Sequence, residues 1–439
     1  MIEYIDDTNN LNTSINYRDV EIKEGINLHL LKTNKFKTTK IKVYVQEQLR
    51  KESAPMLALT SYILFRGTEN KPTTLEMMRY LEKLYGADLS TDAEKYGECQ
   101  YLTLGVEIIN KNYLPGDEDL LGQGLALVLD ILANARTEGG QELFYEDYFN
   151  QEKIVLKDEI KSIFNDKSRY ASKRCTELMC PDEPFGTYKY GSIGYLENIT
   201  NKELYNYYQN LLENNPIHIF VVGNINDDAV IKKVENTFDY FEPRSNQIKP
   251  VVVENKDIAP QTVIEEADVQ QGKLIMGYRT NITRRSPLYP AMIVFNGIFG
   301  ALPHSKLFQN VREKSGLAYY ISTGLDSTKG IIKVTAGIDS GKFDETLKII
   351  KEQFEAMKAG QISQEELEFT IKAYRRSLNY LMDNNDALIN SSILEITNDL
   401  KPSFGALITA IEKVTIEDIQ KAANMVELDT VYFLKSRSE

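Results

Sequence analysis

Arg312 and Tyr319 are the clearest candidates for chemistry in this sequence, because they combine a planar fork of N–H donors with a phenol. They stand on either side of Lys314-Ser315-Gly316, a pattern that ends helices. The segment before this stop, from Lys306 onward, has the spacing of an amphipathic helix, and Ala318–Thr323 has the β-branched and aromatic residues of a strand. We therefore expect the two side chains on two rigid elements joined by a tight turn.

Both residues also have an ordinary structural explanation. Arg312 falls in the last turn of the expected helix, where a cation complements the helix dipole and where Glu313 or Asp339 could pair with it. Tyr319 could pack with Tyr320 in a core. The two residues alone do not decide between substrate contact and structure.

Composition and charge limit the class of protein. The chain has 439 residues, enough for two or more domains, with 42% apolar and 26% charged residues. Its net charge of −13 and the lack of a basic patch disfavour nucleic acid. No stretch approaches the ~18 consecutive apolar residues of a membrane-spanning helix, and the acidic start of the chain matches neither a secretory nor a mitochondrial targeting signal. We expect a cytoplasmic protein that binds neither nucleic acid nor membranes.

Residues that commonly bind metals are few. The cysteines are Cys99, Cys175 and Cys180, and the histidines are His29, His218 and His304. Three sparse cysteines are no disulfide framework, and one pair five residues apart is no zinc pattern, so reduced thiols are expected. Two histidines fall in expected strands and one in a loop, so we interpret all three as structural.

The elements that position these residues follow from hydrophobic periodicity. Alternating apolar residues predict two strands within 20–50, and an almost continuous apolar run predicts a central helix over Ala54–Phe65. Thr74 is expected to cap a second helix, and Thr200 with Glu203 forms a capping box. The remaining elements expected in the first half are strands at Ala87–Ala93, Tyr101–Ile109 and Pro216–Val222 and helices at Leu120–Ala135 and Tyr148–Ile163.

The pattern then starts again after a proline-punctuated linker. Residues 77–108 resemble 307–338, and the segment around Thr200 resembles the one around Thr415. Repetition at an offset of about half the chain predicts a duplicated α+β unit, each copy an antiparallel sheet with helices on one face. The predicted division is a first domain at 1–240, a linker at 241–260 and a second domain at 261–439.

Two phrases connect the chain to a known family. V-R-E-K-S-G-L-A-Y, which contains Arg312 and Tyr319, and E-K-I-V-L-K-D-E-I, which begins at Glu152, resemble the M16 (pitrilysin/insulinase-type) zinc peptidases. The resemblance covers nearly the whole chain and is to the short M16B class, which includes mitochondrial processing peptidase. It implies the M16/LuxS-like metallohydrolase fold, with two domains of about equal size folded together like a clamshell around a polar chamber.

The family's zinc motif, H-x-x-E-H, is degenerate in this chain. The family phrase that follows the motif matches residues 63–68, which places Ala58-Leu59-Thr60-Ser61-Tyr62 at the motif. Ala58 and Tyr62 stand where the two histidine ligands would be, and Ser61 stands for the glutamate base. Glu152 matches the family's third ligand and is interpreted as a remnant of it; the alternatives are an acid on the helix surface or a partner for Lys153 or Lys157. One carboxylate is not the set of about three protein ligands that a catalytic zinc site needs, so no metal or cofactor is expected on this chain.

The resemblance therefore implies a non-catalytic subunit. In two-chain M16B peptidases one chain carries zinc and the other supplies an Arg/Tyr pair, which the motif places at Arg312 and Tyr319. The implied partner is a zinc-bearing M16B paralogue with H-x-x-E-H, in a heterodimer that cleaves unfolded peptides; the chain in isolation is expected to be a homodimer. The chain lacks the long Gly-rich loop of the mitochondrial non-catalytic subunit, which favours a bacterial protein.

Other interpretations stay open. The chain could be a purely structural, scaffolding subunit, as M16-derived core subunits of respiratory complexes are, or a homodimeric peptide-binding module without peptidase role. Retention of the Arg/Tyr spacing argues against the first. Tyr101–Glu107 is either an edge strand that holds an extended peptide by β-addition or an ordinary internal strand.

Overall fold

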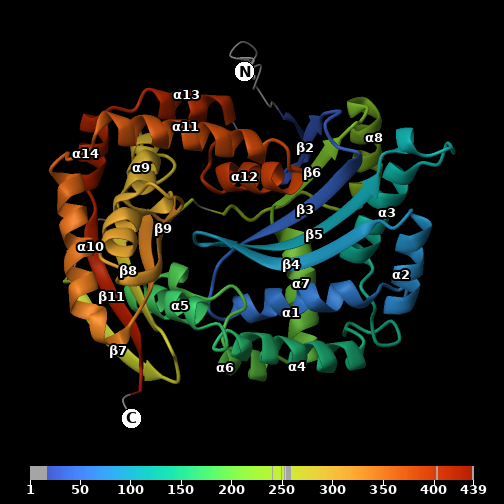
Figure 1. Ribbon diagram of the computed structural model, residues 1–439. Coiled ribbons are helices and arrows are strands. Elements are labelled where there is room, and N and C mark those ends of the chain that lie inside the picture. The colour runs from blue at the N-terminus through green and yellow to red at the C-terminus, as the bar shows by residue number, and fades with distance from the viewer. Residues whose placement is uncertain are drawn as a thin grey trace.

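The computed structural model describes residues 17–239, 241–248, 250–251, 253, 259–401 and 404–437, which form two β-sheets with helices around them (Figure 1). The first sheet has the strand order β1-β2-β6-β3-β5-β4 and the second has β7-β11-β8-β10-β9. The strands of the first are β1 Arg18–Lys23, β2 Ile26–Lys32, β3 Thr38–Gln48, β4 Asp88–Tyr96, β5 Cys99–Ile109 and β6 Ile217–Gly223. Those of the second are β7 Gln261–Ala267, β8 Gly272–Arg279, β9 Ala318–Asp326, β10 Ile331–Ile338 and β11 Glu427–Ser436.

The two sheets are built in the same way, which gives the predicted duplication a structural form. The order β2-β6-β3-β5-β4 corresponds element by element to β7-β11-β8-β10-β9. The α+β class is as expected, but each sheet contains one parallel pair, β2 with β6 and β7 with β11, instead of antiparallel pairing throughout. The last strand of each half returns after a long helical crossover, which permits parallel pairing, and inserts between two earlier strands.

Helices surround the two sheets (Figure 1). Those of the first half are α1 Ser53–Arg66, α2 Thr74–Lys83, α3 Leu120–Ala133, α4 Glu146–Ser162, α5 Lys167–Met179, α6 Ile193–Asn198, α7 Asn201–Asn214 and α8 Asp227–Phe238. Those of the second half are α9 Tyr289–Asn296, the π-helical segments η3 Gly297–Ala301 and η4 Phe308–Lys314, α10 Phe343–Lys358, α11 Gln364–Leu381, α12 Asn385–Thr397, α13 Phe404–Glu412 and α14 Ile416–Asn424. As its apolar sequence predicts, α1 is buried along most of its length in the first core.

The local capping signals were predicted with one error. Thr200 caps α7 and forms the expected capping box with Glu203. The cap of α2 is Thr73, not Thr74: its side chain accepts from the backbone N–H of Glu76, and Glu76 closes the box. Thr73 has extended backbone angles and Thr74 is already helical, so only the former can accept a bond from the third helical residue. The linker's described residues form neither helix nor strand, and the domain division at 241–260 stays a prediction.

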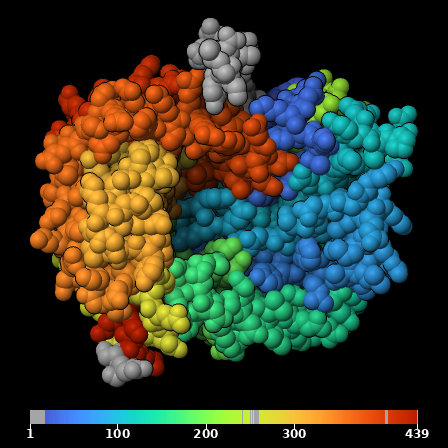
Figure 2. Space-filling view, viewed as in Figure 1, coloured from blue at the N-terminus to red at the C-terminus, as the bar shows by residue number. Residues whose placement is uncertain are grey.

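The two halves exchange one helix each. Helix α5 of the first half packs on β8 and β11 of the second sheet, and α12 of the second half packs on β3 of the first sheet (Figure 1). Each exchanged helix covers the face of the other half's sheet that points away from that half's core. An apolar cluster lies beneath each of the two helices. A clamshell of two separate domains therefore describes the molecule incompletely, although Figure 2 shows that its front remains hollowed between the two halves.

A buried charge cluster joins the halves where the β4–β5 and β9–β10 hairpins meet. Lys329 pairs with Glu98 at 2.5 Å and with Glu183 at 2.7 Å, and Arg279 pairs with Glu183 at 2.8 Å and with Asp429 at 2.7 Å. Glu98 and Glu183 come from the first half and the other three residues from the second. The cluster, which we call the interhalf cluster, therefore fixes the two hairpins against each other.

Membrane insertion of a helix has no support in the part of the chain that the structure describes, where no helix is both long and apolar enough to span a bilayer.

Candidate functional site

Helix α1 carries the positions of the degenerate zinc motif, and two of them are sealed in its core. Ala58 and Ser61 are fully buried. The Ser61 hydroxyl donates to the carbonyl oxygen of Ala58 at 2.8 Å, and the Ser61 carbonyl accepts from the Thr91 hydroxyl at 2.8 Å. Ser61 is thus engaged with backbone and with β4, and Ala58 offers no donor atom.

Tyr62 is the third motif position and lies among aromatic side chains. Its ring meets that of Tyr190 edge to face at 6.2 Å, and the Tyr190 hydroxyl donates to Asp92 at 3.0 Å. Burial, together with Tyr190 and Glu159, raises the pKa of Tyr62, which keeps its phenol protonated at neutral pH. Tyr62 therefore packs as a neutral aromatic.

Glu152 on α4 is paired with a fixed cation. Arg66, the last residue of α1, donates from Nη1 to Glu152 Oε1 at 2.5 Å and from Nη2 to Gln151 at 3.0 Å, and its guanidinium lies 4.7 Å from the Tyr148 ring centre. Neither neighbouring lysine takes the expected role: Lys153 donates to the carbonyl of Ile199 and Lys157 pairs with Glu197.

Sequence reasoning used Arg66 only to fix the register of the motif and missed this contact. The spacing carried a signal, because Ala58, Tyr62 and Arg66 are four residues apart and so share one face of α1. An arginine on the helix face that carries the degenerate metal site can pair with the carboxylate that remains from the ligand set.

These residues do not fit a zinc ion. Such an ion takes about three protein ligands from histidine, cysteine and carboxylate groups. At this place the chain offers an alanine, a serine bonded to backbone, a neutral tyrosine and a carboxylate bonded to arginine. Among all the residues described here, no three His, Cys, Asp or Glu side chains come close enough together to hold a metal.

Arg312 lies near the end of η4, where the expected amphipathic helix is a π-helix. Leu307 and Val311 are buried, as the pattern predicts. The turn closes by hydrogen bonds from Gly316 N–H to the Arg312 carbonyl at 3.1 Å and from Leu317 N–H to the Val311 carbonyl at 3.0 Å, with Gly316 at a φ of 59°. Glycine adopts this left-handed conformation at little cost, so the stop signal was interpreted correctly.

The guanidinium of Arg312 is available to a ligand. Its side chain is 43% exposed, stacks 4.8 Å from the Phe308 ring centre and has Glu313 at 3.8 Å, beyond hydrogen-bond distance. Asp339, the other structural partner considered, instead caps the turn at Gly341.

Tyr319 projects from a β-bulge on an edge strand. Among the described residues, strand β9 pairs only with β10, and in this pair Tyr320 stands opposite Gly337 while Ala318 stands opposite Ile338. Tyr319 is the extra residue, and it is 71% exposed. Bulges re-aim side chains and often lie beside functional sites.

The bulge belongs to the second half alone. In the first half, β4 pairs with β5 in regular register from Asp88 to Tyr96, without an extra residue. Tyr320, the aromatic neighbour expected beside Tyr319 in a core, instead reaches across to α5, where its hydroxyl is 3.0 Å from Ser168. The hairpin of the second half thus carries one extra residue, Tyr319, and its ring is exposed.

Two histidines form a further cluster that was not predicted, because they lie far apart in the sequence. His29 of β2 and His218 of β6 lie on paired strands, with Nε2 of the first 3.2 Å from Nδ1 of the second, and Asp19 is 2.7 Å from Nδ1 of His29. Burial, followed by the neighbouring His29, lowers the pKa of His218 to about 3, so that it is neutral. Only the parallel β2–β6 pair brings these residues together. His304 lies apart in a loop, 2.8 Å from Thr370.

The edge-strand hypothesis for Tyr101–Glu107 is wrong. This segment belongs to β5, which lies between β3 and β4 and is hydrogen-bonded on both sides. Strand β4 is an edge strand of the first sheet, and β9 is an edge strand of the second. Sheet order depends on long-range pairing that the alternation of apolar residues does not encode.

Comparison with known proteins gives consistent matches. The profile described as the peptidase M16 inactive domain matches residues 198–374. The chain is 36% identical over 411 residues to the "Probable inactive metalloprotease YmfF" of Bacillus subtilis, covering 94% of this chain and 96% of that protein. It is 22% identical to the "Uncharacterized zinc protease YmxG" of the same organism, covering 85% and 92% of the two chains.

Solved structures agree. A conserved protein from Enterococcus faecalis superposes with a TM-score of 0.88 at 30% identity, covering 97% of this chain and 99% of that one. A protease from Helicobacter pylori superposes with a TM-score of 0.78 at 15% identity, covering 96% and 100%, and thus shows the same fold.

Proposed function

Since the chain belongs to the peptidase M16 family, as an inactive member, we propose that it is the non-catalytic, substrate-binding subunit of a two-chain zinc endopeptidase in the cytoplasm of a bacterium. Its partner would be an M16 paralogue with an intact H-x-x-E-H motif, and its substrate an unfolded peptide. The zinc of the partner would supply the electrophile and the nucleophilic water for peptide hydrolysis. This chain would supply binding and orientation.

Arg312 and Tyr319 are the residues proposed to act. The Arg312 guanidinium would donate charge-assisted hydrogen bonds to a peptide carbonyl and so fix the substrate's register. The Tyr319 hydroxyl would donate to the scissile carbonyl oxygen as negative charge develops on it. In the described structure the Tyr319 hydroxyl makes no hydrogen bond, so its O–H is free to donate to the substrate.

The β-bulge at Tyr319 carries this proposal. The β4–β5 pair of the first half keeps a regular register, whereas Tyr319 is an extra residue in β9 and is exposed. Exposing a large aromatic ring costs apolar burial worth about 1.5–3 kcal/mol. A contact with another molecule would offset that loss, and Arg312 lies on the adjoining element η4.

The test is a kinetic comparison of the reconstituted pair. We expect Arg312→Ala or Tyr319→Phe to reduce kcat/KM for an unfolded peptide roughly 10- to 1,000-fold, the scale of losing one oxyanion donor. Tyr380→Phe is the matched control, because Tyr380 is also exposed, at 61%, but lies on α11. An unchanged rate for both variants, with normal assembly of the pair, would remove Arg312 and Tyr319 from the mechanism.

Two further outcomes separate this role from its alternatives. Zinc-dependent proteolysis by the isolated chain would contradict a non-catalytic role. A partner that is fully active without this chain would instead favour scaffolding.

A further inference from the structure

The two sheets differ at one edge. Since β2-β6-β3-β5-β4 corresponds to β7-β11-β8-β10-β9, strand β7 is the counterpart of β2, and strand β1 has no counterpart among the described residues of the second half. Strand β1 pairs antiparallel with the outer edge of β2. The outer edge of β7, which we call the β7 edge, is left unpaired by the strands that the structure describes.

In the first half, both a strand and a helix cover this edge. Helix α8 packs on β1 and β2, and Val20 and Ile22 of β1 pack against the first core. Arg18 at the start of β1 also forms an ion pair with Asp228 of α8 at 3.0 Å. The edge of the first sheet is therefore closed by backbone pairing, apolar contact and charge together.

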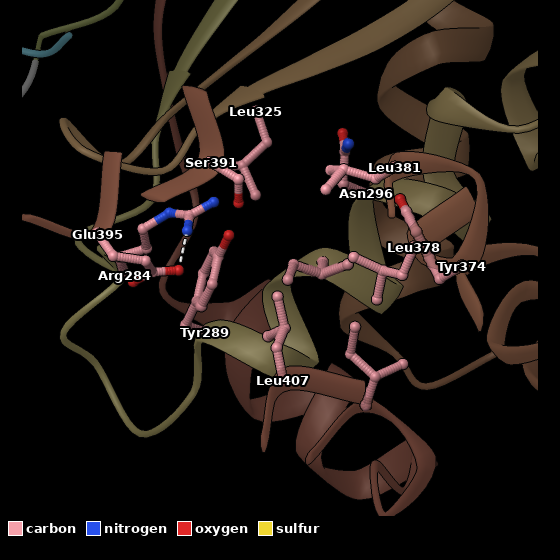
Figure 3. A pocket seen from close by; sticks show the side chains of 12 residues that line it. Arg284, Tyr289, Asn296, Leu325, Tyr374, Leu378, Leu381, Ser391, Glu395 and Leu407 are labelled. Carbon is pink, nitrogen blue, oxygen red and sulfur yellow. Dashed lines mark hydrogen bonds and ion pairs between the residues drawn. The ribbon is translucent and has the colours of Figure 1, made fainter. Parts of the chain in front are cut away.

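The helices of the second half leave the corresponding place open. Helices α9, α11, α12 and α13 gather around a cavity at the opposite end of the second sheet, where Leu325 of β9 forms part of the wall (Figure 3). No described side chain of β7 belongs to the second core, and Ile264 in the middle of β7 is 48% exposed. A large aliphatic side chain on an unpaired edge strand favours pairing with another strand.

The acidic side chains of β7 are neutralised within the chain. Glu265 forms an ion pair with Arg174 at 2.9 Å and accepts a hydrogen bond from the Tyr432 hydroxyl at 2.8 Å. Glu266 forms an ion pair with Lys435 at 3.0 Å. Unpaired charges are a common protection of edge strands against pairing with another chain. The two glutamates do not give β7 that protection, because each has a cation of its own chain beside it.

We propose that the β7 edge binds the β7 edge of a second copy of this chain, so that the two sheets continue into one another through an antiparallel strand pair. Ile264 is the central residue of β7, and a two-fold axis at this position places it opposite the same residue of the second copy. The axis places Glu265 opposite Val263 and the other glutamate opposite Thr262, so no like charges face each other.

The expected strength follows from the size and charge of this contact. One strand pair is smaller than the about 1,600 Å² of a standard protein interface, and each copy has a net charge of −13. We therefore expect a dissociation constant in roughly the micromolar range. Salt should strengthen the association because it screens the repulsion between the copies. A basic peptide held by the glutamates would show the opposite dependence on salt, and that result would overturn the proposal.

Analytical ultracentrifugation of the full chain over a series of concentrations measures the association. We expect a monomer–dimer equilibrium, and we expect Ile264→Lys to raise its dissociation constant roughly 10-fold or more, because the variant places two like charges opposite each other. Leu75→Lys is the matched control, since Leu75 is 59% exposed on α2, and it should change nothing. A chain that stays monomeric, or a dimer equally stable in Ile264→Lys, would overturn the proposal.

Cysteine cross-linking tests the geometry independently. The three native cysteines are buried, so a cysteine introduced on β7 is the accessible one. Opposite residues of an antiparallel pair lie close enough for a disulfide, so Ile264→Cys should give a covalent dimer on copper-catalysed air oxidation. Gln261→Cys should not, because its two copies would lie about 20 Å apart, six residues at ~3.3 Å each. Cross-linking of Gln261→Cys in preference to Ile264→Cys would overturn this arrangement.

This contact is separate from the proposed peptidase role, because β7 and β9 lie at opposite ends of the second sheet. A dimer formed through β7 leaves Tyr319 on β9 available to a zinc-bearing partner. Ile264→Lys should therefore weaken the dimer without reducing kcat/KM of the reconstituted pair. Loss of assembly with that partner in Ile264→Lys would assign the β7 edge to the partner and overturn pairing with a second copy.

Discussion

Lys329→Met tests the interhalf cluster most directly. The Lys329 side chain is 6% exposed, and its ammonium contacts Glu98 and Glu183 of the other half. Methionine retains most of the apolar stem but removes the charge, so two buried carboxylates lose a cation. Breaking a buried ion pair by removing one partner costs about 3–5 kcal/mol. We expect a loss of this size in the free energy of unfolding at neutral pH.

The pH dependence gives the prediction a sign. Burial alone would raise the pKa of Glu183, but hydrogen bonds from Arg279 and Lys329 outweigh it and lower the pKa to about 2. A lowered pKa stabilises the fold above the unfolded value of 4.5, and this contribution is lost as pH falls toward 2. In Lys329→Met the carboxyl of Glu183 should protonate more readily. The difference between wild type and variant should therefore shrink as pH falls through this range.

Urea unfolding followed by circular dichroism, repeated at several pH values, measures both effects. The lowered pKa of His218 also makes the free energy of unfolding depend on pH in acid, but it does so equally in both chains. The difference between variant and wild type is therefore free of this contribution. Lys421→Met is the matched control, since Lys421 is exposed and pairs with Glu417 on the surface; we expect a change within about 0.5 kcal/mol. A loss in Lys329→Met no larger than this control, or one independent of pH, would refute the reasoning.

Three further predictions concern the zinc position and the exchanged helix. Arg66→Met should cost about 3 kcal/mol in unfolding free energy because the buried Glu152 side chain loses its cationic partner, and adding Glu152→Gln should recover much of this loss. Urea unfolding that shows no such recovery would contradict the pairing. Asn390→Leu removes the acceptor for Tyr44 and Lys42 on the first sheet, so α12 should lose about 1–3 kcal/mol of protection in hydrogen exchange, and unchanged exchange would exclude this anchor. Zinc added to the isolated chain should leave the melting temperature unchanged, whereas a site filled at 100 times its Kd would add about 2.7 kcal/mol.

Local features of the fold were predictable because the residues that cause them are adjacent in sequence. The apolar run of α1, the capping box of Thr200 and the glycine stop at Gly316 each depend on a few neighbours, and each was placed correctly. The error at Thr73 is of one residue, since two adjacent threonines offer the same side chain and only backbone angles distinguish them.

Features that depend on pairing between distant segments were not predictable. The β-bulge at Tyr319 is a property of the register between β9 and β10, and the contact of His29 with His218 requires β6 to insert beside β2. The Arg66–Glu152 pair joins helices α1 and α4. The motif located the candidate positions, but their exposure, pairing and charge balance came only from the three-dimensional arrangement.

The exchange of α5 and α12 has a consequence for how a peptide would reach Arg312 and Tyr319. Separating the halves would expose the apolar clusters under both exchanged helices and break the interhalf cluster. It would also leave Lys333 of the second sheet without its hydrogen bonds to Ser172 and Thr176 on α5. Hinge opening within the chain is therefore costly, whereas Tyr319 already lies exposed on an edge strand. Under the proposed function, access would be set by the contact between this chain and its partner, and the chain itself would present Arg312 and Tyr319 from a rigid wall.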